Sequence, residues 1–189
     1  SKRTKSNYLS KVSGLLIWLE SEGYLAQRID SPLRGVIKLD KSAHEERDPY
    51  SDDELRQLFY SDTYLEGKHK FASFFWIPLI GLLSGARENE ICQLELSDIK
   101  FDAPSGLWVF SINQDNPDQT NKSVKKPHHK RLLPIHQILI DLGFLDFYEL
   151  QMALGEKRLF PELPFMKGKG HIDKFQRWYN RTYKNHCGI

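Results

Sequence analysis

Apolar side chains recur every three or four residues at the start of the chain. Five of them fall on one helix face at this spacing: Tyr8, Val12, Leu15, Leu16 and Leu19. The pattern predicts an amphipathic helix over residues 7–22, with Gly23 as its C-cap. A single amphipathic helix cannot bury its apolar stripe alone, so it must pack on another part of the protein.

The periodic pattern breaks between residues 30 and 50. Asp30-Ser31-Pro32 is a turn signal, and residues 41–48 form a dense charged run without periodicity. This composition predicts an interdomain linker over residues 31–50. A new domain then begins, because Ser51 and Glu54 have the spacing of a capping box at the start of a short helix.

The next elements alternate between buried helices and strands. Residues 70–83 are apolar nearly all round and predict a central helix, in which Pro78 implies a kink or a broken hydrogen bond. We expect a short helix at 89–94, a strand at 107–112 paired with one at 131–135, and helices at 137–150 and 172–185. The predicted class is α+β, mainly helical, with a small antiparallel β-sheet.

Composition excludes several classes of protein. The 189 residues are 40% apolar and 28% charged, which indicates a globular chain and not a disordered one. No apolar run approaches the ~18 residues of a membrane span. Two cysteines exclude a disulfide scaffold, so a reducing cytoplasm is the expected compartment.

The distribution of charge is more informative than the formal net charge of +2. Residues 120–136 contain no acidic residue, and residues 165–189 contain six Lys or Arg against Asp173 alone. The first stretch carries five cations: Lys122, Lys125, Lys126, Lys130 and Arg131. Such segregation is typical of a surface that binds a phosphate backbone, although lysine-rich segments are also common as ordinary solvated surface.

Arg87 occupies an unusual place at the start of the predicted helix 89–94. A helix N-terminus already carries partial positive charge, so an arginine there favours a bound anion. Glu90, three residues later, would hold the guanidinium in position. The alternative is a surface Arg–Glu pair that contributes little.

The segment around Arg87 reads Ser84-Gly85-Ala86-Arg87-Glu88-Asn89-Glu90-Ile91-Cys92-Gln93-Leu94, followed by Asp98. It resembles the first conserved box of the tyrosine recombinase, or phage integrase, family. The family pattern continues with a β-hairpin lysine and a basic strand that ends in Val/Leu-Pro-Leu/Ile-His. Residues 125–136 fit that pattern and match Lys125 to the family lysine, with Lys122 and Lys126 as alternatives.

The resemblance implies site-specific DNA recombination and integration in a phage or mobile element. A tyrosine would attack a phosphodiester, and Arg87 would clamp the phosphate oxygens. Lys125 would protonate the departing 5′ oxygen, and Glu90 would orient neighbouring groups of the active site. The implied partner is duplex DNA, bound also by Lys122, Lys126, Lys130 and Arg131. A homotetramer is implied on DNA, with no metal or other cofactor and no membrane, in a bacterial or phage-encoded cytoplasmic protein.

The same resemblance implies a division into domains and a missing part. Residues 1–30 would be the last helix of a core-binding domain, 31–50 a linker, and 51–189 a partial catalytic domain. The family's His-x-x-Arg box and nucleophilic tyrosine would follow the last helix, and no His-x-x-Arg occurs after residue 185 in this sequence. Tyr179 and Tyr183 precede that position, so we expect them to be packing or surface residues and this chain to be a fragment without its nucleophile.

Other functions remain as alternatives at this point. A non-catalytic DNA-binding or regulatory protein with a truncated integrase fold is the main one, and an RNA-binding or protein-interaction module is another. Zinc binding is not favoured, because His128, His129, His136 and Cys187 lack the spacing of a zinc site and have basic neighbours.

Overall fold

The computed structural model describes residues 2–25, 49–115, 121–122 and 130–189. The chain divides into two compact units, Ser1–Pro49 and Tyr50–Ile189, which we describe separately. The expected linker over residues 31–50 falls almost entirely outside the described residues, and so do Lys125 and Lys126.

Helix α1 (Lys2–Ser21) forms most of the described part of the first unit and confirms the predicted helix. It ends as expected at Gly23, which has a φ of 77° and donates its N–H to the carbonyl of Glu20 over 3.0 Å. Leu15 and Trp18 of this helix are 53% and 52% exposed. The assignment of this helix to a core-binding domain stays a prediction.

The second unit begins with the predicted capping box. The Ser51 N–H donates to the Glu54 carboxylate over 2.7 Å, and the Glu54 N–H donates to Ser51 Oγ over 3.3 Å. This exchange satisfies two backbone donors at the start of α2 (Asp52–Phe59). A short helix that the sequence pattern did not predict, α3 (Asp62–Leu65), follows it.

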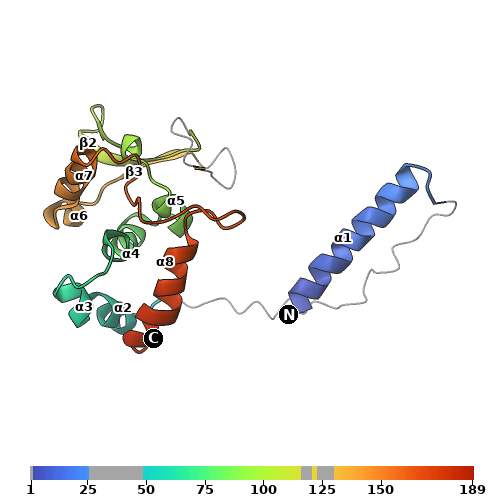
Figure 1. Ribbon diagram of the computed structural model, residues 1–189, viewed down its shortest axis with the longest axis horizontal. Helices are drawn as coiled ribbons and strands as arrows, with labels where there is room; N and C mark the ends of the chain where they lie inside the picture. Colours follow the sequence, from blue (N-terminus) through green and yellow to red (C-terminus); the bar gives the residue numbers. More distant parts are fainter. Residues whose placement is uncertain (1, 26–48, 116–120, 123–129) are drawn as a thin grey trace. The chain divides into compact units, whose positions relative to one another are not determined.

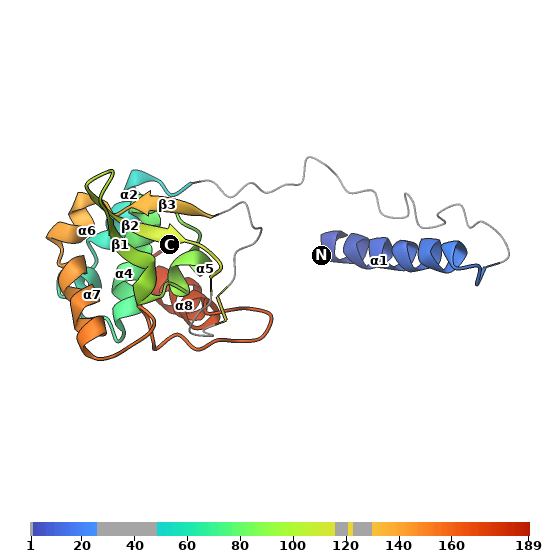
Figure 2. The same cartoon turned by 90° about the horizontal axis from the view of Figure 1, so that it is seen from above.

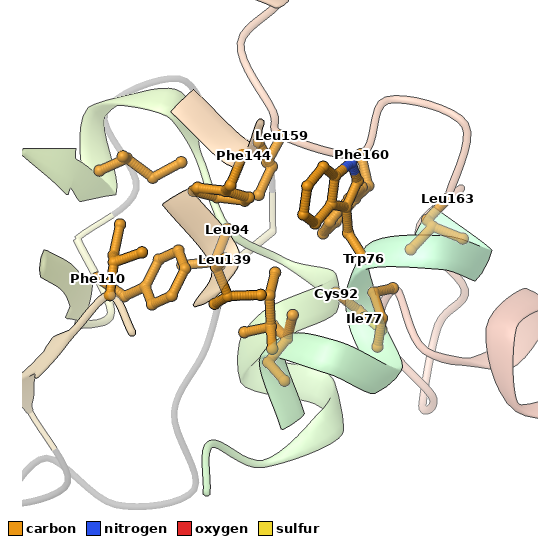
Figure 3. Close-up of a cluster of buried hydrophobic side chains, with 14 of the residues drawn as sticks. Trp76, Ile77, Cys92, Leu94, Phe110, Leu139, Phe144, Leu159, Phe160 and Leu163 are labelled. Atoms are coloured by element: carbon orange, nitrogen blue, oxygen red, sulfur yellow. The ribbon is translucent and has the colours of Figure 1, made fainter. Parts of the chain in front are cut away.

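The predicted central helix is α4 (Ala72–Ser84), which runs through the middle of the unit (Figure 1). It packs against the short helix α5 (Glu88–Cys92) and a core shared by most elements of the unit. Figure 3 shows this core, in which Phe144 lies edge-on to Trp76 of α4 and to Phe110 of the sheet, with ring centroids 5.3 and 5.4 Å away.

A three-stranded antiparallel sheet covers one side of this core. Its order is β1 (Ile99–Asp102), β2 (Leu107–Ile112) and β3 (Arg131–Pro134), so the predicted pairing of the last two strands is confirmed. Phe110 pairs with Ile99 on one side and with Leu133 on the other. The sequence pattern missed β1, which follows a 3₁₀ turn, η1 (Leu96–Asp98).

The C-terminal helices differ from prediction in their boundaries. The helix expected over 137–150 is two helices, α6 (Gln137–Asp141) and α7 (Phe144–Ala153), because Gly143 adopts a φ of 86° between them. The helix expected over 172–185 is confirmed as α8 (Asp173–Trp178), a π-helical turn, η3 (Tyr179–Tyr183), and α9 (Lys184–His186).

A second apolar cluster lies where α2, α3 and η3 meet. Leu58, Tyr64 and Tyr183 are its buried members. The hydroxyl of Tyr183 donates to the carbonyl of Leu58 and lies 2.9 Å from Ser61 Oγ. Tyr183 is thus a packing residue in this structure, and Tyr179 packs against the same cluster.

The second unit is therefore a mainly helical α+β structure with a small antiparallel sheet, as the sequence pattern predicted. Within the described ranges, no helix combines the length and the apolar character that crossing a membrane requires.

Candidate anion-binding site

Arg87 is positioned by the sharp turn between α4 and α5. Gly85 takes a left-handed conformation with a φ of 63°, which lets the chain reverse direction after Ser84. The Ser84 hydroxyl donates to the carbonyl of Ile80 over 2.6 Å and accepts the N–H of Ala86 over 3.2 Å. Arg87 is consequently placed as the N-cap residue of α5.

The carboxylate of Glu90 holds Arg87 and Arg131 together. It accepts the backbone N–H of Arg87 over 3.0 Å and one guanidinium N–H of the same residue over 3.0 Å. It also accepts two N–H groups of Arg131, from Nη2 over 2.7 Å and from Nη1 over 3.3 Å. Arg131 comes from the first position of β3, so the site joins the sheet to the α4–α5 turn.

Burial differs sharply among these three side chains. The Glu90 side chain is 4% exposed, whereas those of Arg87 and Arg131 are 53% and 33% exposed. Burial disfavours ionisation of Glu90, but the hydrogen bonds from Arg131 and Arg87 outweigh it and hold its pKa below the ordinary value. The carboxylate is therefore charged at neutral pH, and the three residues carry a formal charge of +1.

This arrangement suits an anion with several oxygens. A guanidinium presents its N–H groups in a planar fork that matches the oxygens of a phosphate, and here two guanidiniums share one anchor. The N-terminus of α5 adds little to the attraction of an anion, because this helix is only five residues long. The fixed pair of guanidiniums is the feature that favours a phosphate.

Glu88 introduces a negative charge beside this pair. It is the residue after Arg87, and its carboxylate accepts an N–H of Gln176 in α8 over 2.9 Å. Burial raises the pKa of Glu88, and the hydrogen bond from Gln176 partly opposes that shift. An anion at this site would therefore be attracted by the guanidiniums of Arg87 and Arg131 and repelled by the carboxylate of Glu88.

Lys122, an expected DNA contact and alternative hairpin lysine, is buried. Its ammonium contacts both carboxylate oxygens of Asp98 and lies 3.8 Å from Glu95, and its side chain is 2% exposed. Asn113 donates a further hydrogen bond to Asp98 over 2.8 Å. Two buried carboxylates hold this ammonium inside the protein, so the structure gives Lys122 an internal position and not a surface for DNA.

The remaining predicted DNA contacts divide into described and undescribed residues. Lys130 is exposed and forms an ion pair with Asp115 over 3.0 Å, at the base of the connection between β2 and β3. An exposed pair of this kind contributes little to stability, so Lys130 can exchange Asp115 for a phosphate at small cost. Lys125 and Lys126 lie outside the described residues.

The sequence pattern predicted the contact between Arg87 and Glu90, but it did not predict the contact between Arg131 and Glu90. It assigned Arg131 only to the general basic strand. The signal for its role is its position as the first residue of β3, yet the contact depends on how the sheet packs on the α4–α5 turn.

Among the residues that the structure describes, no group of three or more His, Cys, Asp or Glu side chains could hold a metal ion. Comparison of the chain with known proteins found no matching family model, no similar curated protein and no similar solved structure.

Proposed function

We propose that this protein acts in site-specific DNA recombination as a tyrosine recombinase, and that Arg87 and Arg131 bind the DNA phosphate at which strands are exchanged. The observation that carries the proposal is the buried Glu90 carboxylate, which fixes two partly exposed guanidiniums from distant parts of the chain side by side. The sequence pattern around Arg87, described above, supplies the family.

The chemistry of such an enzyme fits these residues. A tyrosine oxygen attacks the phosphorus, a protein phosphotyrosyl bond forms, and the 5′ oxygen of the DNA leaves with a proton. Negative charge on the non-bridging oxygens is stabilised by guanidiniums that are fixed before the reaction. The phosphotyrosyl linkage conserves the energy of the broken phosphodiester, so rejoining of the DNA strands needs no nucleoside triphosphate. In this proposal Lys125 donates the proton to the leaving oxygen.

Duplex DNA binding over a range of salt concentrations tests the phosphate site. Each phosphate contact contributes a slope of about −0.9 to the dependence of log K on log salt concentration. The Arg87→Gln and Arg131→Gln variants should each make that slope shallower, by about one. Arg56→Gln is a matched control, because Arg56 is an exposed arginine on α2 in an ion pair with Asp53. Absence of duplex binding, or equal slopes in all variants, would overturn the proposal.

Nicked duplex DNA separates binding from covalent chemistry. We expect the 189-residue chain to bind such DNA without forming a phosphotyrosyl adduct, because Tyr183 is buried and hydrogen-bonded and Tyr179 packs beside it. A covalent adduct mapped to either tyrosine by mass spectrometry would contradict their assignment as packing residues.

A further inference from the structure

A basic turn projects from the second unit just before α8. The N–H of Met166 donates to the carbonyl of Gly170, and the N–H of Gly170 returns to the carbonyl of Met166, each over 2.8 Å. Gly168 and Gly170 close this turn with φ values of 81° and 74°. Lys167 and Lys169 lie within the turn, and both are exposed.

Both views of the molecule place this turn at one end of the unit. In Figures 1 and 2 it extends beyond α5 and α8, and it points away from α6 and α7. The strand β3, which begins with Arg131, starts toward the same end. The turn and the proposed phosphate site thus occupy the same end of the unit.

Asp173 organises two cations behind this turn. Its carboxylate contacts the ammonium of Lys169 and accepts a hydrogen bond from Arg177 Nη2 over 2.8 Å. The Asp173 side chain is 7% exposed, whereas those of Lys169 and Arg177 are 60% and 58% exposed. This group resembles the site at Glu90, because in both a buried carboxylate contacts two partly exposed cationic side chains.

Two contacts join this second group to α5. A Cβ on Gly170 would lie 2.8 Å from Asn89 Oδ1, so the turn packs closely on α5 at this glycine. One helical turn into α8, Gln176 donates to Glu88 over 2.9 Å. Since Arg87 is the N-cap residue of α5, the two cationic groups stand on elements in direct contact.

We infer that Lys167, Lys169 and Arg177 form a second contact for the phosphate backbone of the duplex that Arg87 and Arg131 hold. This inference rests on the proposed function and extends it along the DNA. A duplex carries one negative charge per ~1.7 Å of its axis, so a phosphate at Arg87 brings others past the neighbouring surface. Glu88 lies between the two groups and opposes this binding.

The salt dependence of duplex binding by the full chain tests the inference. The Lys167→Gln/Lys169→Gln variant should reduce the slope of log K against log salt concentration by about 1.8, at about 0.9 for each lost contact. The matched control is Lys68→Gln/Lys100→Gln, which removes the same charge. It also contains one ion-paired lysine, because Lys68 pairs with Glu66. We expect the control to leave the slope unchanged.

Glu88→Gln provides a variant with the opposite expected effect. The amide oxygen of glutamine can still accept the hydrogen bond of Gln176, so the contact between α5 and α8 is kept while the charge is lost. Duplex binding should become tighter. Unchanged or weaker binding would remove Glu88 from the interface and contradict a duplex that spans both cationic groups.

The outcomes separate this inference from the proposed function. If Arg87→Gln lowers the slope while the Lys167/Lys169 variant matches its control, the second contact is overturned and the phosphate site stands. If the unmodified chain does not bind duplex DNA, both fail. Equal thermal unfolding temperatures of the variants show that a changed slope does not come from unfolding.

Discussion

In the part of the chain that the structure describes, buried carboxylates hold one or two cations in place at three positions. Glu90 holds Arg87 and Arg131, Asp98 holds Lys122, and Asp173 holds Lys169 and Arg177, each with a carboxylate that is less than 8% exposed. A buried charge without a partner is costly, so each carboxylate strongly favours one arrangement of its cations. The surfaces that we propose for DNA are outer faces of such groups.

Replacing Glu90 with glutamine should lower the free energy of unfolding at pH 7 by about 1–3 kcal/mol, since hydrogen bonds to a charged group are lost. The folded state lowers the pKa of Glu90 below its ordinary value of 4.5. The stabilisation by its charge is therefore present above that value and is lost as pH falls through the folded pKa.

Urea unfolding of the unmodified chain and Glu90→Gln from pH 7 to pH 3 checks this sign. The difference between the two proteins should be largest at neutral pH and shrink in acid. A difference that grows as pH falls would show that the carboxylate is not held in its charged form by the two arginines.

The buried ammonium of Lys122 supports a second prediction at the residue scale. Lys122→Met would remove the cation that contacts buried Asp98, and losing one partner of a buried pair costs about 3–5 kcal/mol. Denaturant unfolding should show this loss, and Lys122→Met/Asp98→Asn should recover part of it. A surface lysine would give a loss below about 0.5 kcal/mol, which would contradict the internal position.

Among the elements, the turn between α4 and α5 depends on one glycine. Gly85 has a φ of 63°, and beyond its chain neighbours no heavy atom lies within 4 Å of where a Cβ would stand. A larger side chain there therefore meets backbone strain and no clash. Gly85→Ala should cost about 1–2 kcal/mol of stability, and Gly85→Asn should cost less because asparagine tolerates this conformation. Thermal unfolding measures both, and an equal cost for the two variants would point to a clash instead.

The sequence predicted elements well where a local signal exists. The structure confirms the helix that the capping box at Ser51 predicted, the helix predicted from the apolar run of α4, and the strand predicted at 107–112, which is β2. The strand β1 was missed because it is four residues long and only one of them is buried. The break at Gly143 was missed because the apolar pattern continues on both sides of it.

The candidate site was predictable only in its local part. Arg87 and Glu90 are three residues apart at the start of one short helix, so their contact follows from spacing. Arg131 is 41 residues from Glu90, and Lys122 is 24 residues from Asp98. Those contacts depend on tertiary packing, which a basic sequence pattern does not specify. The pattern predicted a charged surface for both Arg131 and Lys122.

On the scale of the whole molecule, the apolar core belongs to the second unit. Every residue of the two hydrophobic clusters lies between Leu58 and Ile189, and the capping box that begins α2 starts at Ser51. The division into units falls just before these residues, at Pro49. Among the described residues, the hydrophobic clusters of the second unit are therefore made by its own sequence.

A chain of residues 50–189 should consequently fold by itself. We expect it to unfold in one cooperative transition, within a few degrees of the same transition in the full chain, because a ΔΔG of 1 kcal/mol shifts the midpoint by about 2–8 °C in domains of this size. Calorimetry of both chains measures the two midpoints. A fall of more than about 10 °C on removal of residues 1–49 would mean that the first unit supplies packing that the second unit needs, and would contradict a second unit that is stable by itself.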